Sequence, residues 1–181
     1  MERLGHGIVN PVIIHDYDPR WPELFETLRS RIAGALGSMA AAIEHVGSTA
    51  VPGLAAKPII DMDVLLKSDA DFPLVIAKLA SIGYEHEGDL GIAGREAFRS
   101  PPKTCEHHLY VCGPGSSAYA QHIAFRDYLR THPQDADAYA ELKRKLAGKF
   151  LDNRDAYTQA KSGFIVEILQ RISDKRISGF R

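Results

Sequence analysis

The amino-acid sequence predicts an α/β (α+β) fold, in which a β-sheet carries flanking helices and a helical portion follows. Up to about residue 115, short apolar segments typical of strands alternate with amphipathic helical segments. From residue 116 onward only helical periodicity continues. We therefore expect an α/β core over residues 1–115, a helical portion over 116–173 packed on it in a single compact unit, and a tail over 174–181.

Length and composition narrow the class of protein. With 181 residues, of which 45% are hydrophobic and 25% charged, the chain can bury the core of one globular domain. No apolar run reaches the roughly 20 residues of a membrane-spanning helix. The N-terminal MERLGHGIVN has no basic stretch followed by an apolar one, so we expect a cytoplasmic protein without a signal peptide. No dense basic stretch with interleaved aromatic residues occurs, which argues against nucleic acid as the partner.

The first third of the chain contains the strongest strand signals. Residues 11–17 and 41–46 are predicted as strands, and PIIDMDVLL (58–66) is the clearest strand of the chain. Residues 22–36 are predicted as an amphipathic helix. Its apolar face repeats at helical spacing through Leu24, Phe25, Leu28, Ile32 and Leu36. The segment GSTAVPGLAAK, rich in small residues, is expected to be a loop.

The middle of the chain alternates again between helix and strand. Asp69 or Asp71 is expected to cap a helix that ends near Ser81. Residues 84–99 contain one or two weak strands around the glycine-rich turn GDLGIAG, and HHLYVC (107–112) is a further strand. Three helices then follow. Their expected first residues are Ser116 or Ser117, Pro133, and Asp152 or Asn153.

Two aspartates stand within the strand predicted over 58–66. Because side chains alternate between the faces of a strand, Asp61 and Asp63 point to one side while the apolar residues between and beside them point into the core. The two carboxylates repel each other unless a positive charge lies between them. A cation such as Mg²⁺ fits, since it binds one or two protein carboxylates and completes its shell with phosphate oxygens and water. A half-exposed strand whose aspartates have no function is the alternative.

The loop before this strand offers groups that suit an anion. Gly47 and Ser48 directly follow the strand predicted over 41–46. Glycine lets the backbone approach a ligand closely, and Ser48 offers a hydroxyl and an amide N–H. Lys57, four residues before Asp61, supplies a positive charge for a phosphate. The loop lacks the Gly-Lys-Ser/Thr ending of a Walker A motif.

These segments resemble a known family. EHVGSTAVPGLAAKPIIDMDV (44–64) resembles the signature of the GrpB family, and AFRDYLRTHP, YAELKRKLA and AYTQAKSGFI resemble its later segments, so the resemblance extends from about residue 12 to residue 170. The spacing between Gly47-Ser48 and Asp61-Met62-Asp63 is similar to that of the nucleotidyltransferase superfamily of the polymerase-beta type. The resemblance implies a mixed β-sheet of nucleotidyltransferase type with flanking helices.

The resemblance also implies an activity, the metal-dependent transfer of a nucleotidyl group from a nucleoside triphosphate to an unknown small-molecule or protein acceptor. Asp61 and Asp63 would bind Mg²⁺ or Mn²⁺, and Gly47, Ser48 and Thr49 would hold the nucleotide. Because some family members are fused to a dephospho-coenzyme A kinase, coenzyme A metabolism is a lead to the acceptor.

Further nucleotide contacts are implied in the later family-like segments. Lys143, Tyr157 and Lys161 are the preferred candidates there. Other basic residues, each with a solvated surface position as the alternative, are Arg99, Arg126 and Lys149.

Active members of the superfamily carry a third carboxylate on a later strand, which here corresponds to EHHLYVC (106–112). Glu106, His108 and Tyr110 share one face of that strand. The third ligand and catalytic group is therefore Glu106, His108 or absent. A metal site completed by His108 would favour Mn²⁺ or Zn²⁺ over Mg²⁺, which prefers oxygen.

Two other functions remain open. Without a third carboxylate, the fold would bind a nucleotide or coenzyme A precursor without turning it over. A metal-dependent phosphohydrolase built from Asp61, Asp63, His108 and His45 is the second alternative.

Overall fold

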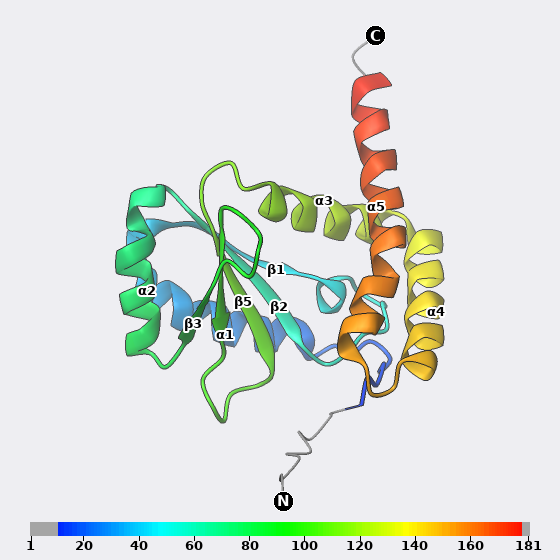
Figure 1. Cartoon of the computed structure of the whole chain (residues 1–181), viewed down its shortest axis with the longest axis horizontal. Helices are drawn as coiled ribbons and strands as arrows, with labels where there is room; N and C mark the ends of the chain where they lie inside the picture. The colour runs from blue at the N-terminus through cyan, green and yellow to red at the C-terminus, as the bar shows by residue number, and fades with distance from the viewer. Residues whose placement is uncertain (1–10, 179–181) are drawn as a thin grey trace, which may run out of the picture.

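The computed structural model describes residues 11–178, and within them a five-stranded mixed sheet is flanked by helices (Figure 1). The strand order is β1-β2-β5-β4-β3, in which β2 and β5 run parallel and all other neighbours run antiparallel. The predicted α/β class is therefore confirmed. Residues 1–10 of the expected core and 179–181 of the expected tail lie outside the described residues.

Three neighbouring strands hold the sequence motifs. They are β1 (Ala40–Val46), β2 (Ile60–Leu66) and β5 (His107–Cys112), each within two residues of its predicted bounds. The weak strands are β3 (Glu85–Gly88) and β4 (Arg95–Arg99), on either side of the glycine-rich turn.

The prediction of a strand over residues 11–17 is wrong. His15 forms one isolated bridge with Ala56, and the Val12 amide donates to the Leu151 carbonyl. Both partners lie in connecting segments and not in a strand, so the alternating apolar residues of this segment have no sheet edge to extend.

Five α-helices complete the described fold. They are α1 (Trp21–Leu36), α2 (Phe72–Ser81), α3 (Ser117–Thr131), α4 (Pro133–Lys149) and α5 (Arg154–Ser178). The Ser116 hydroxyl accepts from the Tyr119 amide at the start of α3, and the Asn153 side chain accepts from the Ala156 amide at the start of α5. None of the helices described between residues 11 and 178 combines the length and apolarity needed to cross a bilayer.

Two helix predictions need correction. Before α2, the Ser68 hydroxyl accepts from the Ala70 amide, and neither predicted aspartate makes a side-chain cap; Asp69–Asp71 instead form a short 3₁₀ turn. The expected tail is helical as far as Ser178, because no glycine or proline interrupts residues 164–178 and Ile172 still packs against the helical core.

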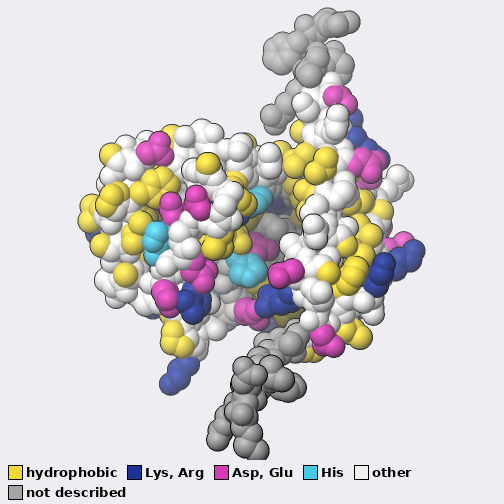
Figure 2. Space-filling view, in the orientation of Figure 1, with side chains coloured by type: hydrophobic (Ala, Val, Ile, Leu, Met, Phe, Trp, Pro, Cys, Tyr) yellow, Lys and Arg dark blue, Asp and Glu magenta, His cyan; other side chains and the backbone are white. Residues whose placement is uncertain are grey.

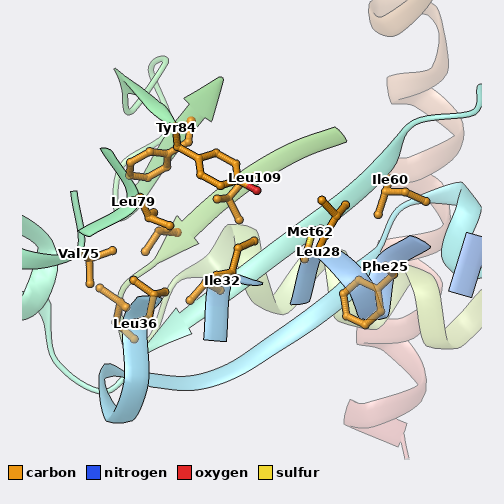
Figure 3. Close-up of a cluster of buried hydrophobic side chains, with 14 of the residues drawn as sticks. Phe25, Leu28, Ile32, Leu36, Ile60, Met62, Val75, Leu79, Tyr84 and Leu109 are labelled. Atoms are coloured by element: carbon orange, nitrogen blue, oxygen red, sulfur yellow. The ribbon is translucent and has the colours of Figure 1, made fainter. Parts of the chain in front are cut away.

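The main core lies between the sheet and the helices α1 and α2 (Figure 3). Met62, Val64 and Leu109 are fully buried in it, as the alternation in the two strands predicts. On α1, however, Leu24 is exposed and Trp21 takes its place at the start of the buried stripe.

A second core joins the C-terminal helices to the loop that follows β1. Val51 and Leu54 of that loop pack in one cluster with Tyr139 of α4 and Ile168 of α5. This packing holds α5 beside the loop, at one side of the sheet (Figure 1). Residues from both halves of the chain therefore line one pocket together with Asp61.

Candidate active site

The aspartates lie on the sheet face opposite the main core. In register, Asp61 stands beside His108 of β5, and Asp63 stands between Glu44 of β1 and Tyr110 of β5. Because residues in register point to the same side, these side chains share one face. Helix α3 passes over this face, and its His122 contacts Asp63.

Gly47 brings the loop after β1 directly against Asp61. Its backbone has φ 71° and ψ −170°, a combination that essentially only glycine adopts. A Cβ at this position would stand 2.2 Å from Asp61 Oδ2. The absence of a side chain at Gly47 therefore allows the backbone and the carboxylate to meet.

A buried hydrogen-bond chain holds the same loop. The Thr49 hydroxyl donates to the Ile59 carbonyl at 3.2 Å and lies 2.9 Å from His45 Nε2. Since Thr49 donates its hydrogen to the carbonyl, His45 Nε2 is the donor to the hydroxyl. Burial lowers the pKa of His45 to about 4, which keeps the ring neutral. Thr49 and His45 thus position the Gly47-Ser48 segment, and Ser48 itself lines the pocket.

Each aspartate accepts a hydrogen bond from a histidine. His108 Nδ1 lies 2.8 Å from Asp61 Oδ1, and His122 Nδ1 lies 2.7 Å from Asp63 Oδ2. Burial raises the pKa of Asp63, although the bond to His122 opposes that shift. Burial also lowers the pKa of His122, but the hydrogen bond and charge of Asp63 outweigh burial and the net pKa is raised.

His122 lies at the site, although it was not predicted there from the sequence. Its spacing of four residues from Arg126 places both on one side of α3, the side that faces the sheet. That spacing indicates that the His122 side chain faces the sheet, but it does not indicate which strand residue the side chain contacts.

The strand β5 supplies no carboxylate at the aspartate pair. Glu106, which precedes β5, has a side chain 60% exposed and lies 3.7 Å from Arg154 of α5, outside the pocket that holds Asp61. His108 does lie at the pocket, beside Asp61. Of Glu106 and His108, the two residues considered for the third position, the geometry therefore favours His108.

The carboxylate pair offers oxygen atoms of the kind that a divalent cation binds. Asp63 is completely buried, and its Oδ1 accepts no hydrogen bond within the described part of the chain. Such an orphaned acceptor is costly unless a ligand satisfies it. Among residues 11–178 no cluster of three or more acidic, histidine or cysteine side chains could hold a metal ion. A cation here would therefore need oxygens from substrate and water, as Mg²⁺ commonly does.

Two of the predicted lysines line the pocket. Lys57 and Lys161 place Nζ 5.5 Å and 4.5 Å from the centre of the Tyr157 ring. Burial, followed by repulsion from Lys57, lowers the pKa of Lys161 to about 8, and burial also lowers the pKa of Lys57. Two neighbouring cations repel each other, and a bound anion would offset that repulsion.

Lys143 and Tyr157 lie behind the pocket wall. Lys143 is 2% exposed, and its ammonium donates to the Ala55 carbonyl. Burial lowers the pKa of Lys143 to about 7. Tyr157 is buried beneath the two lysines, so it supports them and does not line the pocket.

The pocket is a cavity of about 400 Å³ between the sheet and α5, where charged and histidine side chains gather (Figure 2). Arg95 of β4 and Tyr110 also line it, although neither was predicted as a binding residue. By contrast, Arg126 binds Glu44 and the His45 carbonyl outside the pocket lining. Arg99 pairs with Glu85 and Glu87 at the far end of the sheet.

Related proteins place the chain in a family. The family model described as GrpB protein matches residues 11–171. The UPF0157 protein BH1888 of Halalkalibacterium halodurans is 39% identical over 163 residues, covering 88% of this chain and 82% of that protein. The UPF0157 protein YqkA of Bacillus subtilis is 38% identical over 82% of this chain, which spans 43% of YqkA. A Mycolicibacterium paratuberculosis protein named dephospho-CoA kinase is 26% identical over 91% of this chain and 46% of that protein.

Solved structures give the same assignment. The conserved protein GrpB from Enterococcus faecalis superposes with a TM-score of 0.83 at 36% identity, covering 91% of this chain and 99% of that chain. A structure of the Cid1 poly(U) polymerase superposes with a TM-score of 0.53 at 16% identity, over 75% of this chain and 44% of that chain, which relates the fold to nucleotidyltransferases. The protein is therefore a member of the GrpB family with a nucleotidyltransferase-like fold.

Proposed function

We propose that the protein transfers a nucleotidyl group from a nucleoside triphosphate to an acceptor hydroxyl with the aid of Mg²⁺ or Mn²⁺. The observation that carries this proposal is the approach of Gly47 to Asp61, which joins the loop after β1 to the carboxylate pair. Lys57 and Lys161 stand at the same pocket. A cation site beside a cationic, glycine-containing loop suits a metal-bound triphosphate better than it suits an uncharged ligand.

In the proposed reaction, the acceptor oxygen forms a bond to the α-phosphorus. The bond from that phosphorus to the bridging oxygen breaks, and pyrophosphate leaves. A divalent cation held by Asp61 and Asp63 would neutralise charge that develops on the phosphate oxygens. Lys57 and Lys161 balance the charge of the triphosphate.

His108 is the proposed acceptor of the hydroxyl proton. Its Nδ1–H donates to Asp61, which leaves Nε2 as the basic nitrogen of the ring. The same hydrogen bond fixes the orientation of the ring, as a carboxylate does for a histidine base in other enzymes.

A second candidate function is nucleotide or coenzyme A precursor binding without turnover. The observation that favours it is the lack of a carboxylate on β5 at the aspartate pair, where His108 and Tyr110 stand. The relative named dephospho-CoA kinase makes coenzyme A precursors reasonable ligands or acceptors to include. Release of pyrophosphate separates this candidate from the transferase.

Thermal unfolding tests the proposal. Wild type and Asp61→Asn/Asp63→Asn are heated with each nucleoside triphosphate or coenzyme A precursor, with and without Mg²⁺ or Mn²⁺. A ligand at about 100 times its Kd stabilises a protein by roughly 2.7 kcal/mol. We expect a metal-dependent shift with a nucleotide in the wild type, its loss in the double variant, and its retention in Asp137→Asn, where an exposed aspartate on α4 is changed. A wild type that no nucleotide shifts under any condition would refute the proposal.

A further inference from the structure

Arg95 is a buried cation that forms no ion pair with another residue in the part of the chain that the structure describes. Arg95 is the first residue of β4, and it lines the candidate active site. The residue is only 7% exposed, and its Nε is buried without a hydrogen-bond acceptor within the described part of the chain. No ion pair within residues 11–178 involves Arg95. Burying an arginine in this state is unfavourable, which indicates a function beyond stability.

Tyr110 fixes the orientation of the guanidinium group. The guanidinium carbon of Arg95 lies 4.2 Å from the centre of the Tyr110 ring. That ring stands between the two histidines, 6.4 Å from the His108 ring and 6.3 Å from the His122 ring. A guanidinium that rests on an aromatic ring keeps its N–H donors free to bind a carboxylate or phosphate in its own plane.

Arg95 and the paired lysines lie toward different ends of the strands. Arg95 stands in register with Cys112, four residues beyond His108 along β5, whereas Lys57 precedes the start of β2. The proposed triphosphate site at Lys57 and Lys161 is therefore separate from Arg95, although both line the same cavity. An acceptor that presents its hydroxyl near His108 would extend from there toward Arg95.

We infer that Arg95 and Tyr110 form a subsite for an anionic group, a carboxylate or a phosphate, on the acceptor molecule. This inference rests on the proposed function, because it assigns the acceptor to the half of the pocket that the triphosphate leaves free. It restricts the acceptor to hydroxyl compounds that also carry an anionic oxygen group. The alternative is that Arg95 acts only as a distant counter-charge for Asp63: burial raises the pKa of that carboxyl group, and the charge of Arg95 opposes a small part of the rise.

Anion binding to the nucleotide-loaded protein tests the inference. The protein is saturated with Mg²⁺ and a non-hydrolysable ATP analogue, and inorganic phosphate or malonate is then titrated by calorimetry. We expect at least one of the two anions to bind, with a loss of at least tenfold in affinity in Arg95→Met and a smaller loss in Arg95→Lys, which keeps the charge but not the planar donor fork. The anion that binds more tightly identifies phosphate or carboxylate as the acceptor group.

Two control variants define the outcomes. Arg99→Met removes an exposed arginine from the same strand and should bind the anion like the wild type. Lys161→Met should lower the affinity for the ATP analogue but leave the affinity for phosphate or malonate unchanged. Equal anion affinity in Arg95→Met and wild type would overturn the inference. If the ATP analogue does not bind, but binding of phosphate or malonate to the unloaded protein still requires Arg95, the subsite is supported and the proposed transferase activity is refuted.

Thermal unfolding separates the subsite from a structural role. Because Arg95 forms no ion pair with any residue between 11 and 178, Arg95→Met should unfold at the same temperature as the wild type or at a higher one. A lower melting temperature in both Arg95→Met and Arg95→Lys, with anion affinity unchanged, would assign Arg95 to stability and overturn the subsite.

Discussion

Replacing Gly47 by alanine should lower the free energy of unfolding and displace Asp61. The added methyl group causes both backbone strain and a steric clash. The backbone at φ 71° and ψ −170° is a region that costs other residues about 1–3 kcal/mol. The new Cβ would also stand 2.2 Å from Asp61 Oδ2 and 2.9 Å from Asp61 Cβ, so the carboxylate must move. Overpacking of this kind costs about 1–3 kcal/mol more.

Gly53→Ala is the matched control for Gly47→Ala. Gly53 also has a positive φ, of 81°, but an added Cβ there meets no atom within 4 Å. Its substitution should cost only the backbone strain, about 1–2 kcal/mol. Urea unfolding should therefore show Gly47→Ala to be less stable than Gly53→Ala by about 1–3 kcal/mol.

A double-mutant cycle shows whether the extra cost comes from Asp61. In an Asp61→Ala background the nearest carboxylate atoms are gone, so Gly47→Ala should be less destabilising there, with a coupling of about 0.5–3 kcal/mol. Equal stability of the two glycine variants, or no coupling with Asp61, would refute the contact on which the proposed function depends.

Two further predictions concern buried charge. The pKa of Lys143 is lowered to about 7, so from about pH 7 to pH 9 the unfolded chain holds more protons than the folded one and stability rises with pH, by up to about 1.4 kcal/mol per pH unit. In urea unfolding, the free energy of unfolding of Lys143→Met should rise less with pH than that of the wild type. Equal pH dependence in the two proteins would contradict the burial of a partly neutral amine. His122→Ala removes the hydrogen-bond donor of the buried Asp63 and should cost about 1–3 kcal/mol at pH 7. His86→Ala, which breaks an exposed pair with Glu96, should cost less than about 1 kcal/mol, and equal losses would contradict the account of Asp63.

Local sequence patterns were sufficient to predict most strands and helices. The alternation within PIIDMDVLL correctly placed Asp61 and Asp63 on one face, because a strand repeats every two residues. Helical spacing also contained an unused signal, since Lys143 lies four residues from both Tyr139 and Ala147 on the buried face of α4.

The residues that were missed depend on contacts between distant segments. His122 meets Asp63 across 59 positions of sequence, and that contact follows from the passage of α3 over the sheet. Arg95 belongs to a weak strand with no clear alternation, so its face could not be predicted before its register with β5 was known. Glu106 shows the same limit, because its place just before β5 turns it toward Arg154 and away from the aspartates.

Binding of Mn²⁺, followed by electron paramagnetic resonance, tests the role of the aspartate pair most directly. Wild type, Asp61→Asn/Asp63→Asn and Asp137→Asn are titrated with Mn²⁺ in the presence and absence of a non-hydrolysable ATP analogue. We predict that the analogue strengthens Mn²⁺ binding in the wild type and in Asp137→Asn, and that the double variant binds at least tenfold more weakly, a difference of about 1.4 kcal/mol. Equal Mn²⁺ affinity in the wild type and the double variant would contradict the assignment of Asp61 and Asp63 as metal ligands, and with it the proposed transferase.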